Sequence, residues 1–71
     1  MDMQGRRKHK VLFELPADEA YDERPDAVAT EIAAASARTM RRQLLPGSVV
    51  RNTMVGSDGF MRYEYAFYTM P

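Results

Sequence analysis

The chain has 71 residues, and its ten basic and ten acidic side chains give a formal net charge of zero. This balance excludes the strong overall positive field with which many proteins attract nucleic acid or anionic membranes. The absence of cysteine excludes disulfides, thiol nucleophiles and thiolate metal ligands, and it fits a reducing compartment.

Length and hydropathy also limit the class of protein. A chain this short forms one domain near the size at which a single core barely outweighs chain entropy, so we expect a homodimer or higher oligomer. No apolar run approaches the ~18 residues that cross a bilayer, and residues 1–15 lack the apolar stretch of a signal peptide. We therefore expect a cytoplasmic protein without membrane contact. Arginine outnumbers lysine by eight to two, a bias that points weakly to a prokaryotic or phage genome.

The first residues are polar and show no periodicity. We interpret residues 1–8 as a flexible basic arm that precedes a folded domain of residues 9–71. The cations at this end form a candidate phosphate-binding set, although such a cluster is also typical of a solvated tail. The set comprises Arg6, Arg7, Lys8 and Lys10.

The segment 9–15 alternates between apolar and polar residues, which predicts a half-buried strand. Val11, Phe13 and Leu15 share the face expected to enter the core. Pro16 ends the strand, and an acidic connection follows it. His9, the only histidine, adjoins the arm among cations, so we interpret it as an exposed residue at the strand edge.

The segment Pro25 to Leu45 predicts one long helix. A proline suits the first helical turn, and Pro46 with Gly47 is a typical stop. Spacing at 100° per residue predicts a buried arc made mostly of small side chains. The arc contains Val28, Ala29, Ile32, Ala33, Ser36, Thr39, Met40, Gln43 and Leu44.

Two further strands, 48–55 and 60–70, flank the turn-forming sequence GSDG and predict a hairpin. Symmetric closure of a four-residue loop places Val55 opposite Phe60, and Arg51 opposite Glu64. The strand face expected to pack on the helix is rich in aromatic residues. This face collects Val50, Met54, Met61, Tyr63, Tyr65 and Phe67.

These elements predict an α+β fold: a single βαββ domain whose three-stranded sheet has the order 1-3-2, with the long helix packed on one face. The opposite face carries more apolar surface than a solvent-facing side requires. We predict that it forms the oligomer interface, through Leu12, Val49, Phe60, Ala66 and Tyr68.

No pattern of residues indicates catalysis. The lone histidine is not placed for a Ser-His-Asp triad, the carboxylates of residues 18–23 lack EF-hand spacing, and GSDG lacks the lysine and hydroxyl of a P-loop. The alternating aromatics of residues 61–67 could stack bases, but this period opposite a helix is typical of a core. We therefore expect no enzymatic activity, no metal and no cofactor.

The helix arginines Arg38, Arg41 and Arg42 are predicted to share one solvent face, with no acidic residue three or four positions away. They form a candidate partner-binding patch for carboxylates or phosphates, although cations at this end also stabilise a helix dipole. The sequence thus favours a small non-enzymatic module that binds and modulates another protein as a homodimer. The alternative is a nucleic-acid-binding regulator that uses the arm and the helix arginines. A third hypothesis is an enzyme built across an oligomer interface.

Overall fold

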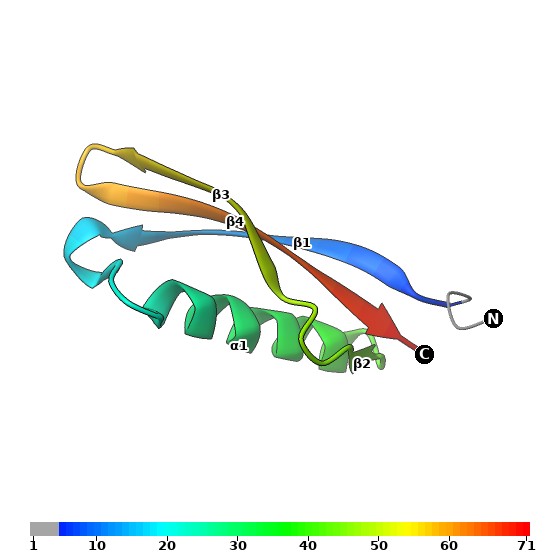
Figure 1. Ribbon diagram of the computed structural model, residues 1–71. Coiled ribbons are helices and arrows are strands. Elements are labelled where there is room, and N and C mark those ends of the chain that lie inside the picture. The colour runs from blue at the N-terminus through cyan, green and yellow to red at the C-terminus, as the bar shows by residue number, and fades with distance from the viewer. Residues whose placement is uncertain (1–4) are drawn as a thin grey trace.

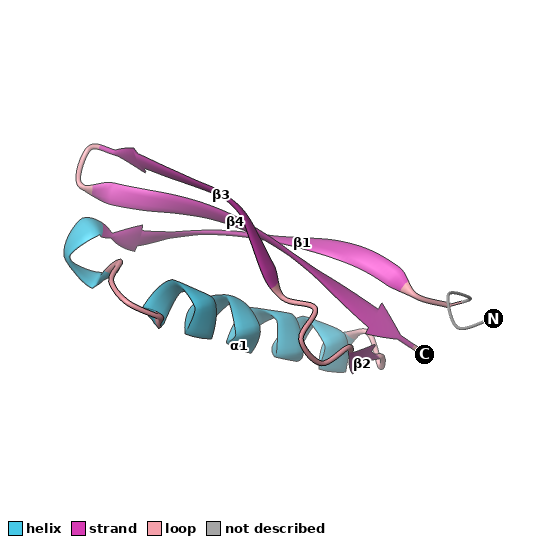
Figure 2. Ribbon diagram, viewed as in Figure 1, coloured by secondary structure: helices cyan, strands magenta, loops and turns pink. Residues whose placement is uncertain are grey.

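In the computed structural model, which describes residues 5–71, one helix covers one face of an antiparallel sheet (Figure 1). Figure 2 shows the strands in one layer and the helix in the other. The α+β class and the single helix are therefore confirmed. The elements in chain order are β1 (Arg7–Pro16), a 3₁₀ turn (Ala17–Glu19), α1 (Arg24–Thr39), β2 (Gln43–Leu44), β3 (Val50–Ser57) and β4 (Phe60–Met70).

The sheet is organised around β4. On one side β4 pairs with β1, and on the other it pairs with β3 and, near its end, with the short β2. The predicted position of the last strand between the first strand and its hairpin partner is confirmed. The predicted count of three strands is wrong, because the described residues contain a fourth strand, β2.

Strand β1 follows the predicted alternation but begins two residues early. Val11 and Leu15 are buried beneath the helix, together with half-buried Phe13. Arg7 and Lys8, which we assigned to the arm, pair with the last residues of β4. Residues 1–4 of that predicted arm lie outside the described residues. Within residues 5–71, no helix is long and apolar enough to span a bilayer.

The helix ends at Thr39, and the prediction that it continues to Leu45 is wrong. The Arg41 backbone has a φ of 58°, which is left-handed. The amide of Arg42 donates to the Ala37 carbonyl over 2.9 Å, and the Arg41 amide donates to the Arg38 carbonyl over 3.0 Å. These two bonds form a Schellman motif, which closes a helix and turns the chain away from its axis. Residues 43–44 consequently pair with β4 instead of extending the helix.

The hairpin turn contains two residues and not four. Asp58 and Gly59 have φ values of 53° and 82°, as a type I′ turn requires, and Ser57 pairs with Phe60. The predicted pairing of Val55 with Phe60 is therefore wrong by two positions, and Val55 pairs with Arg62. A shift of two positions keeps every side chain on its predicted face.

A bulge changes the faces at the start of β3. The register shifts between Arg51 and Thr53, so that Val50 pairs with Ala66 and Arg51 pairs with Tyr65. The predicted core position of Val50 and the predicted pairing of Arg51 with Glu64 are both wrong. An extra residue in one strand reverses the alternation beyond it.

The core joins a helix surface of small side chains to large aromatic residues of the sheet. Every fourth helical residue from Pro25 to Ala37 is buried, whereas Thr39 and Met40 of the predicted arc are exposed. Small residues allow close approach of α1, and the sheet supplies most of the buried apolar area. The core cluster contains Val11, Leu15, Ala29, Ala33, Tyr63, Tyr65 and Phe67.

One buried aromatic residue also links the sheet to the first turn of the helix. The Tyr65 hydroxyl donates a hydrogen bond to the Asp26 carboxylate. Burial, followed by this hydrogen bond, raises the pKa of Tyr65 well above its ordinary value of 10.0. The Tyr65 hydroxyl therefore stays protonated and acts as a fixed donor to the start of α1.

Candidate basic site at one end of the sheet

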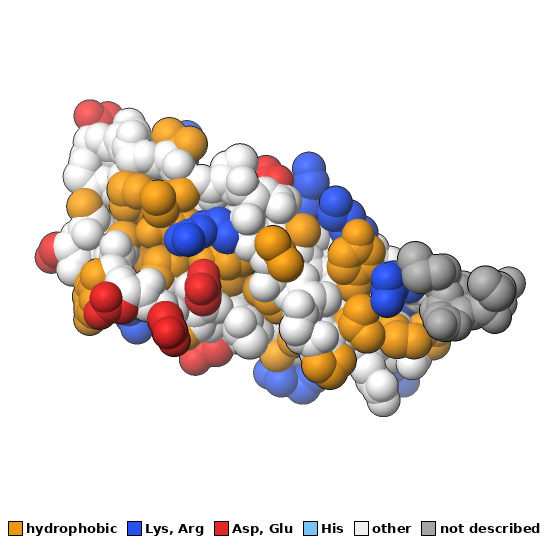
Figure 3. All heavy atoms as spheres, viewed as in Figure 1, with side chains coloured by type: hydrophobic (Ala, Val, Ile, Leu, Met, Phe, Trp, Pro, Cys, Tyr) orange, Lys and Arg blue, Asp and Glu red, His pale blue; other side chains and the backbone are white. Residues whose placement is uncertain are grey.

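Two basic segments that are distant in the sequence meet at one end of the molecule. The end of β4 pairs with Arg7 on one side and with residues 43–44 on the other. The start of β1 and the exit from α1 therefore flank the same stretch of β4. Most acidic side chains on the face shown in Figure 3 lie toward the opposite end. We call this cluster the basic site: Arg6, Arg7, Lys8, Lys10, Arg38, Arg41 and Arg42.

Arg42 is the fixed centre of the basic site. Its Nε donates to Thr69 Oγ1 over 2.8 Å, and its Nη2 donates to the carbonyl oxygens of Gly5 and Thr69. The prediction that Arg38, Arg41 and Arg42 share a solvent face of the helix is wrong, because α1 ends before Arg41. Arg38 and Arg41 are exposed, whereas Arg42 is half-buried and oriented by the sheet.

Thr69 connects Arg42 to the only histidine. The Thr69 side chain is fully buried, and its Oγ1 lies 2.8 Å from His9 Nε2. The His9 ring also stacks on Phe67, with a centroid distance of 4.9 Å. The prediction of an exposed His9 is therefore wrong. Sequence spacing contained no signal for this contact, because it depends on the pairing of β1 with β4.

The charge state of His9 follows from this arrangement. Burial, then the positive charges of Arg42 and Arg7, lower the pKa of His9 below 6.5. Thr69 Oγ1 accepts the hydrogen bond from Arg42 Nε and keeps one proton and one lone pair, so that the tautomer of the His9 ring decides whether Oγ1 donates to Nε2 or accepts from it. Protonated His9 would add a third positive charge beside Arg42 and Arg7.

The lowered pKa predicts weaker folding in mild acid. The unfolded chain binds a proton near pH 6.5, whereas folded His9 does so only at lower pH. The stability that neutral His9 contributes is thus complete above the unfolded-state pKa of 6.5, and it falls as pH decreases toward the pKa of the folded protein. Urea unfolding between about pH 7.5 and about pH 5 should show that the free energy of unfolding of wild type decreases, relative to that of His9→Gln, as pH falls. A constant difference between the two proteins would contradict this assignment.

The remaining cations differ in how they are held. The Arg6 guanidinium lies 5.3 Å from the centroid of the Tyr68 ring, a cation–π geometry, and its buried Nε has no hydrogen-bond partner within residues 5–71. Lys10 Nζ lies 3.9 Å from the Glu64 carboxylate. No other member of the basic site forms an ion pair within the described part of the chain. The site therefore presents largely uncompensated positive charge, some of which stabilises the negative end of α1.

The open face, the side of the sheet away from α1, differs from the predicted oligomer interface. Leu12 is 73% exposed and Phe60 is 47% exposed. Val49 instead packs against the core, because the bulge reverses its direction. Ala66 is buried, and the guanidinium of Arg6 lies over half-buried Tyr68. Only two of the five predicted residues thus remain prominent on this face.

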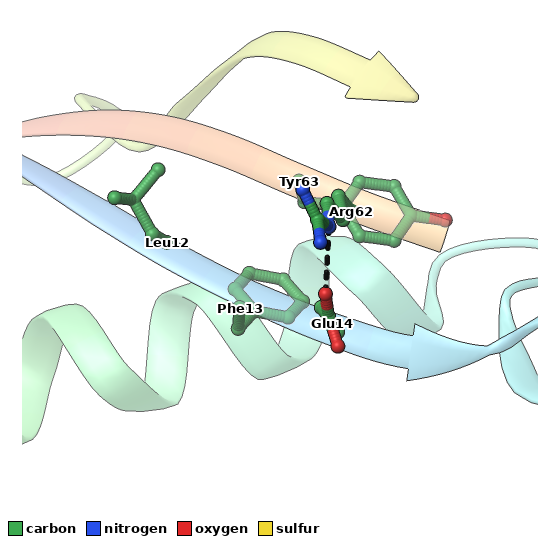
Figure 4. A pocket seen from close by; sticks show the side chains of 5 residues that line it. All are labelled: Leu12, Phe13, Glu14, Arg62 and Tyr63. Atoms are coloured by element: carbon green, nitrogen blue, oxygen red, sulfur yellow. Dashed lines mark hydrogen bonds and ion pairs between the residues drawn. The ribbon is translucent and has the colours of Figure 1, made fainter. Parts of the chain in front are cut away.

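Ion pairs also cross the open face. A shallow hollow of about 340 Å³ lies beside Leu12, and its wall includes a bond of 2.7 Å from Arg62 Nε to the Glu14 carboxylate (Figure 4). The second ion pair joins Lys10 to Glu64. The centre of this face is therefore polar, with apolar side chains between charged pairs. Covering it with a second sheet would remove these ions from water at considerable cost.

No family model, curated protein or solved structure matches this chain. Within residues 5–71, no group of three or more histidine and carboxylate side chains is placed to hold a metal ion. The basic site is therefore the strongest functional candidate on geometry alone, and the absence of enzymatic activity stays a prediction.

Proposed function

We propose that the protein is a small non-enzymatic interaction module that binds an acidic surface of another cytoplasmic protein through the basic site. Binding modulates that partner, and the module works as a homodimer. The observation that supports this proposal is the convergence of the two basic segments, residues 6–10 and 38–42, at one end of the sheet. Among the members of this site, only Lys10 has a carboxylate partner within residues 5–71.

The chemistry of the site suits carboxylates. Guanidinium groups bind carboxylates through paired hydrogen bonds and shed water more readily than lysine. Arg42 is already oriented by Thr69 and Gly5, which lowers the entropy lost on binding. Exposed Arg38 and Arg41 provide further donors. Such a local field also steers association even though the net charge is zero.

The charge distribution favours a compact acidic patch over a long polyanion. The molecule is 44 Å long, and on the face shown in Figure 3 most acidic side chains lie toward the end opposite the basic site. A nucleic acid running along this length would meet like charge. The alternative function, regulation through nucleic-acid binding, uses the same cations but requires a different partner geometry.

Binding of two defined probes separates these functions. Fluorescence anisotropy would follow a labelled polyglutamate peptide and a mixed-sequence DNA duplex at several salt concentrations. We expect peptide binding that the Arg38→Glu/Arg41→Glu variant weakens at least about tenfold. The Arg24→Glu/Arg62→Glu variant is the control, because it has the same net charge but alters exposed arginines outside the basic site. We expect it to retain most of the peptide affinity.

Two outcomes would overturn the proposal. Equal losses in both double variants would mean that overall charge, and not the basic site, governs binding. The nucleic-acid alternative would be established if the protein bound the duplex more tightly than the peptide, and if its affinity for the duplex fell with salt as steeply as the release of several counterions requires.

A further inference from the structure

Strand β3 has an unusually open environment. Each of its eight residues, Val50–Ser57, is exposed, and it pairs with β4 along one side only. Its other edge has no partner within residues 5–71. More than half of Val50, Met54 and Val55 is accessible to water. An exposed, apolar strand edge with unpaired backbone groups favours pairing with another strand.

The two edges of the sheet differ in charge. The outer edge of β1 carries Arg7, Lys8, Lys10 and Glu14, so two copies joined there would have to accommodate charged side chains along most of the strand. Charged side chains of this kind protect an edge from self-association. β3 carries one charge, on Arg51, and residues 52–57 carry none. Charged side chains therefore protect the β1 edge, whereas β3 has almost no charge that would oppose self-pairing.

We infer that two copies of the chain pair antiparallel along their β3 edges, about a two-fold axis at Val55, and join two sheets into one. This inference rests on the homodimer part of the proposed function and names its interface. Antiparallel pairing keeps each side chain on its own face, so residues of equal parity lie opposite one another. Val55 then lies beside the partner subunit's Val55, and Thr53 beside the partner subunit's Ser57.

This register is complementary in shape and charge. Met54 lies opposite the partner subunit's Gly56, so that a large side chain meets a position without one. The valine pair and the hydroxyl pair are both favourable across strands. Arg51, at the bulge, comes beside the partner subunit's Asp58 in the hairpin turn, which joins opposite charges. The bulge limits regular pairing to about residues 53–57.

Edge pairing also avoids the cost of packing two open faces together. The Arg62–Glu14 and Lys10–Glu64 pairs stay in water, whereas face-to-face packing would bury them. Backbone N–H and C=O groups on the free edge would gain partners. The basic sites lie at the distal ends of the joined sheet and stay accessible.

Charge exchange at the two-fold axis provides the test. Sedimentation velocity should show wild type at about twice the 8.1 kDa chain mass. Val55→Lys and Val55→Glu should each weaken the dimer by about tenfold or more, because like charges then face each other. An equimolar mixture should recover the dimer. Leu12→Lys, on the open face, is the matched control and should remain dimeric.

Several results would overturn the interface. These are a monomeric wild type, a mixture that stays monomeric, or dissociation by Leu12→Lys alone. Hydrogen exchange of wild type gives a second readout that needs no variant. Alternate amides of residues 53–57 should gain protection from exchange as the protein concentration rises, and unchanged protection would contradict the proposed interface. Peptide binding by monomeric Val55→Lys is measured separately, so loss of the dimer and loss of the proposed function are distinguishable.

Discussion

Phe67→Ala is expected to destabilise the fold by about 3–5 kcal/mol, the usual cost of removing a buried aromatic ring. Phe67 is 1% exposed and stacks on His9. The helix packs on the sheet through alanines, which are too short to fill the resulting cavity. A core of this size rarely supplies more than about 5 kcal/mol in total, so the variant should be largely unfolded. Thermal unfolding followed by circular dichroism would measure the loss.

Phe60→Ala is the matched control for this result. Phe60 belongs to the same strand, but it is 47% exposed on the open face. Its removal should cost less than about 1 kcal/mol, since most of its apolar surface already contacts water. Similar losses in the two variants would show that the faces of β4 are assigned wrongly.

Thr69→Val should cost about 2 kcal/mol, although the two side chains have nearly the same shape. The change removes the one hydroxyl that joins His9 Nε2 to Arg42 Nε. Both partners are half-buried, so water can replace the lost bonds only in part. Urea unfolding would measure the effect, and Thr69→Ser, which keeps the hydroxyl, should lose clearly less. Equal losses would assign the effect to packing and not to hydrogen bonding.

The predicted core residues are largely correct because alternation tolerates some errors of register. Tyr63, Tyr65 and Phe67 remain on the helix face although the hairpin turn is misplaced by two positions. The bulge before Thr53 is different, because one extra residue exchanges the two faces. No residue type near it marks its position, so Val49 and Val50 were assigned to the wrong sides.

The residue at which the helix ends is not marked by its type. Glycine usually occupies the left-handed position that closes a helix, but this chain has Arg41 there. By contrast, Asp58-Gly59 is a strong signal for a two-residue turn, and the prediction of a four-residue loop is wrong because Ser57 pairs with Phe60. Local residue types could therefore fix the turn but not the helix end.

Both basic segments could be named from the sequence, but their proximity in the folded protein could not be predicted. Residues 6–10 and 38–42 meet only because each segment lies beside the end of β4, and because Arg42 bonds to Thr69 and Gly5. The role of His9 depends on the same strand pairing. Contacts of this range follow from topology, which local patterns do not determine.

The most direct test of the basic site is an NMR titration of the isotope-labelled protein with polyglutamate peptide at low salt. Amide shifts should change most in residues 6–10 and 38–42, together with the side-chain Nε resonance of Arg42. The changes should diminish as salt is added, because exposed charges are screened. Shifts concentrated on β3 or on the open face around Leu12, or no shifts at all, would contradict the proposal that this end of the sheet binds an acidic partner.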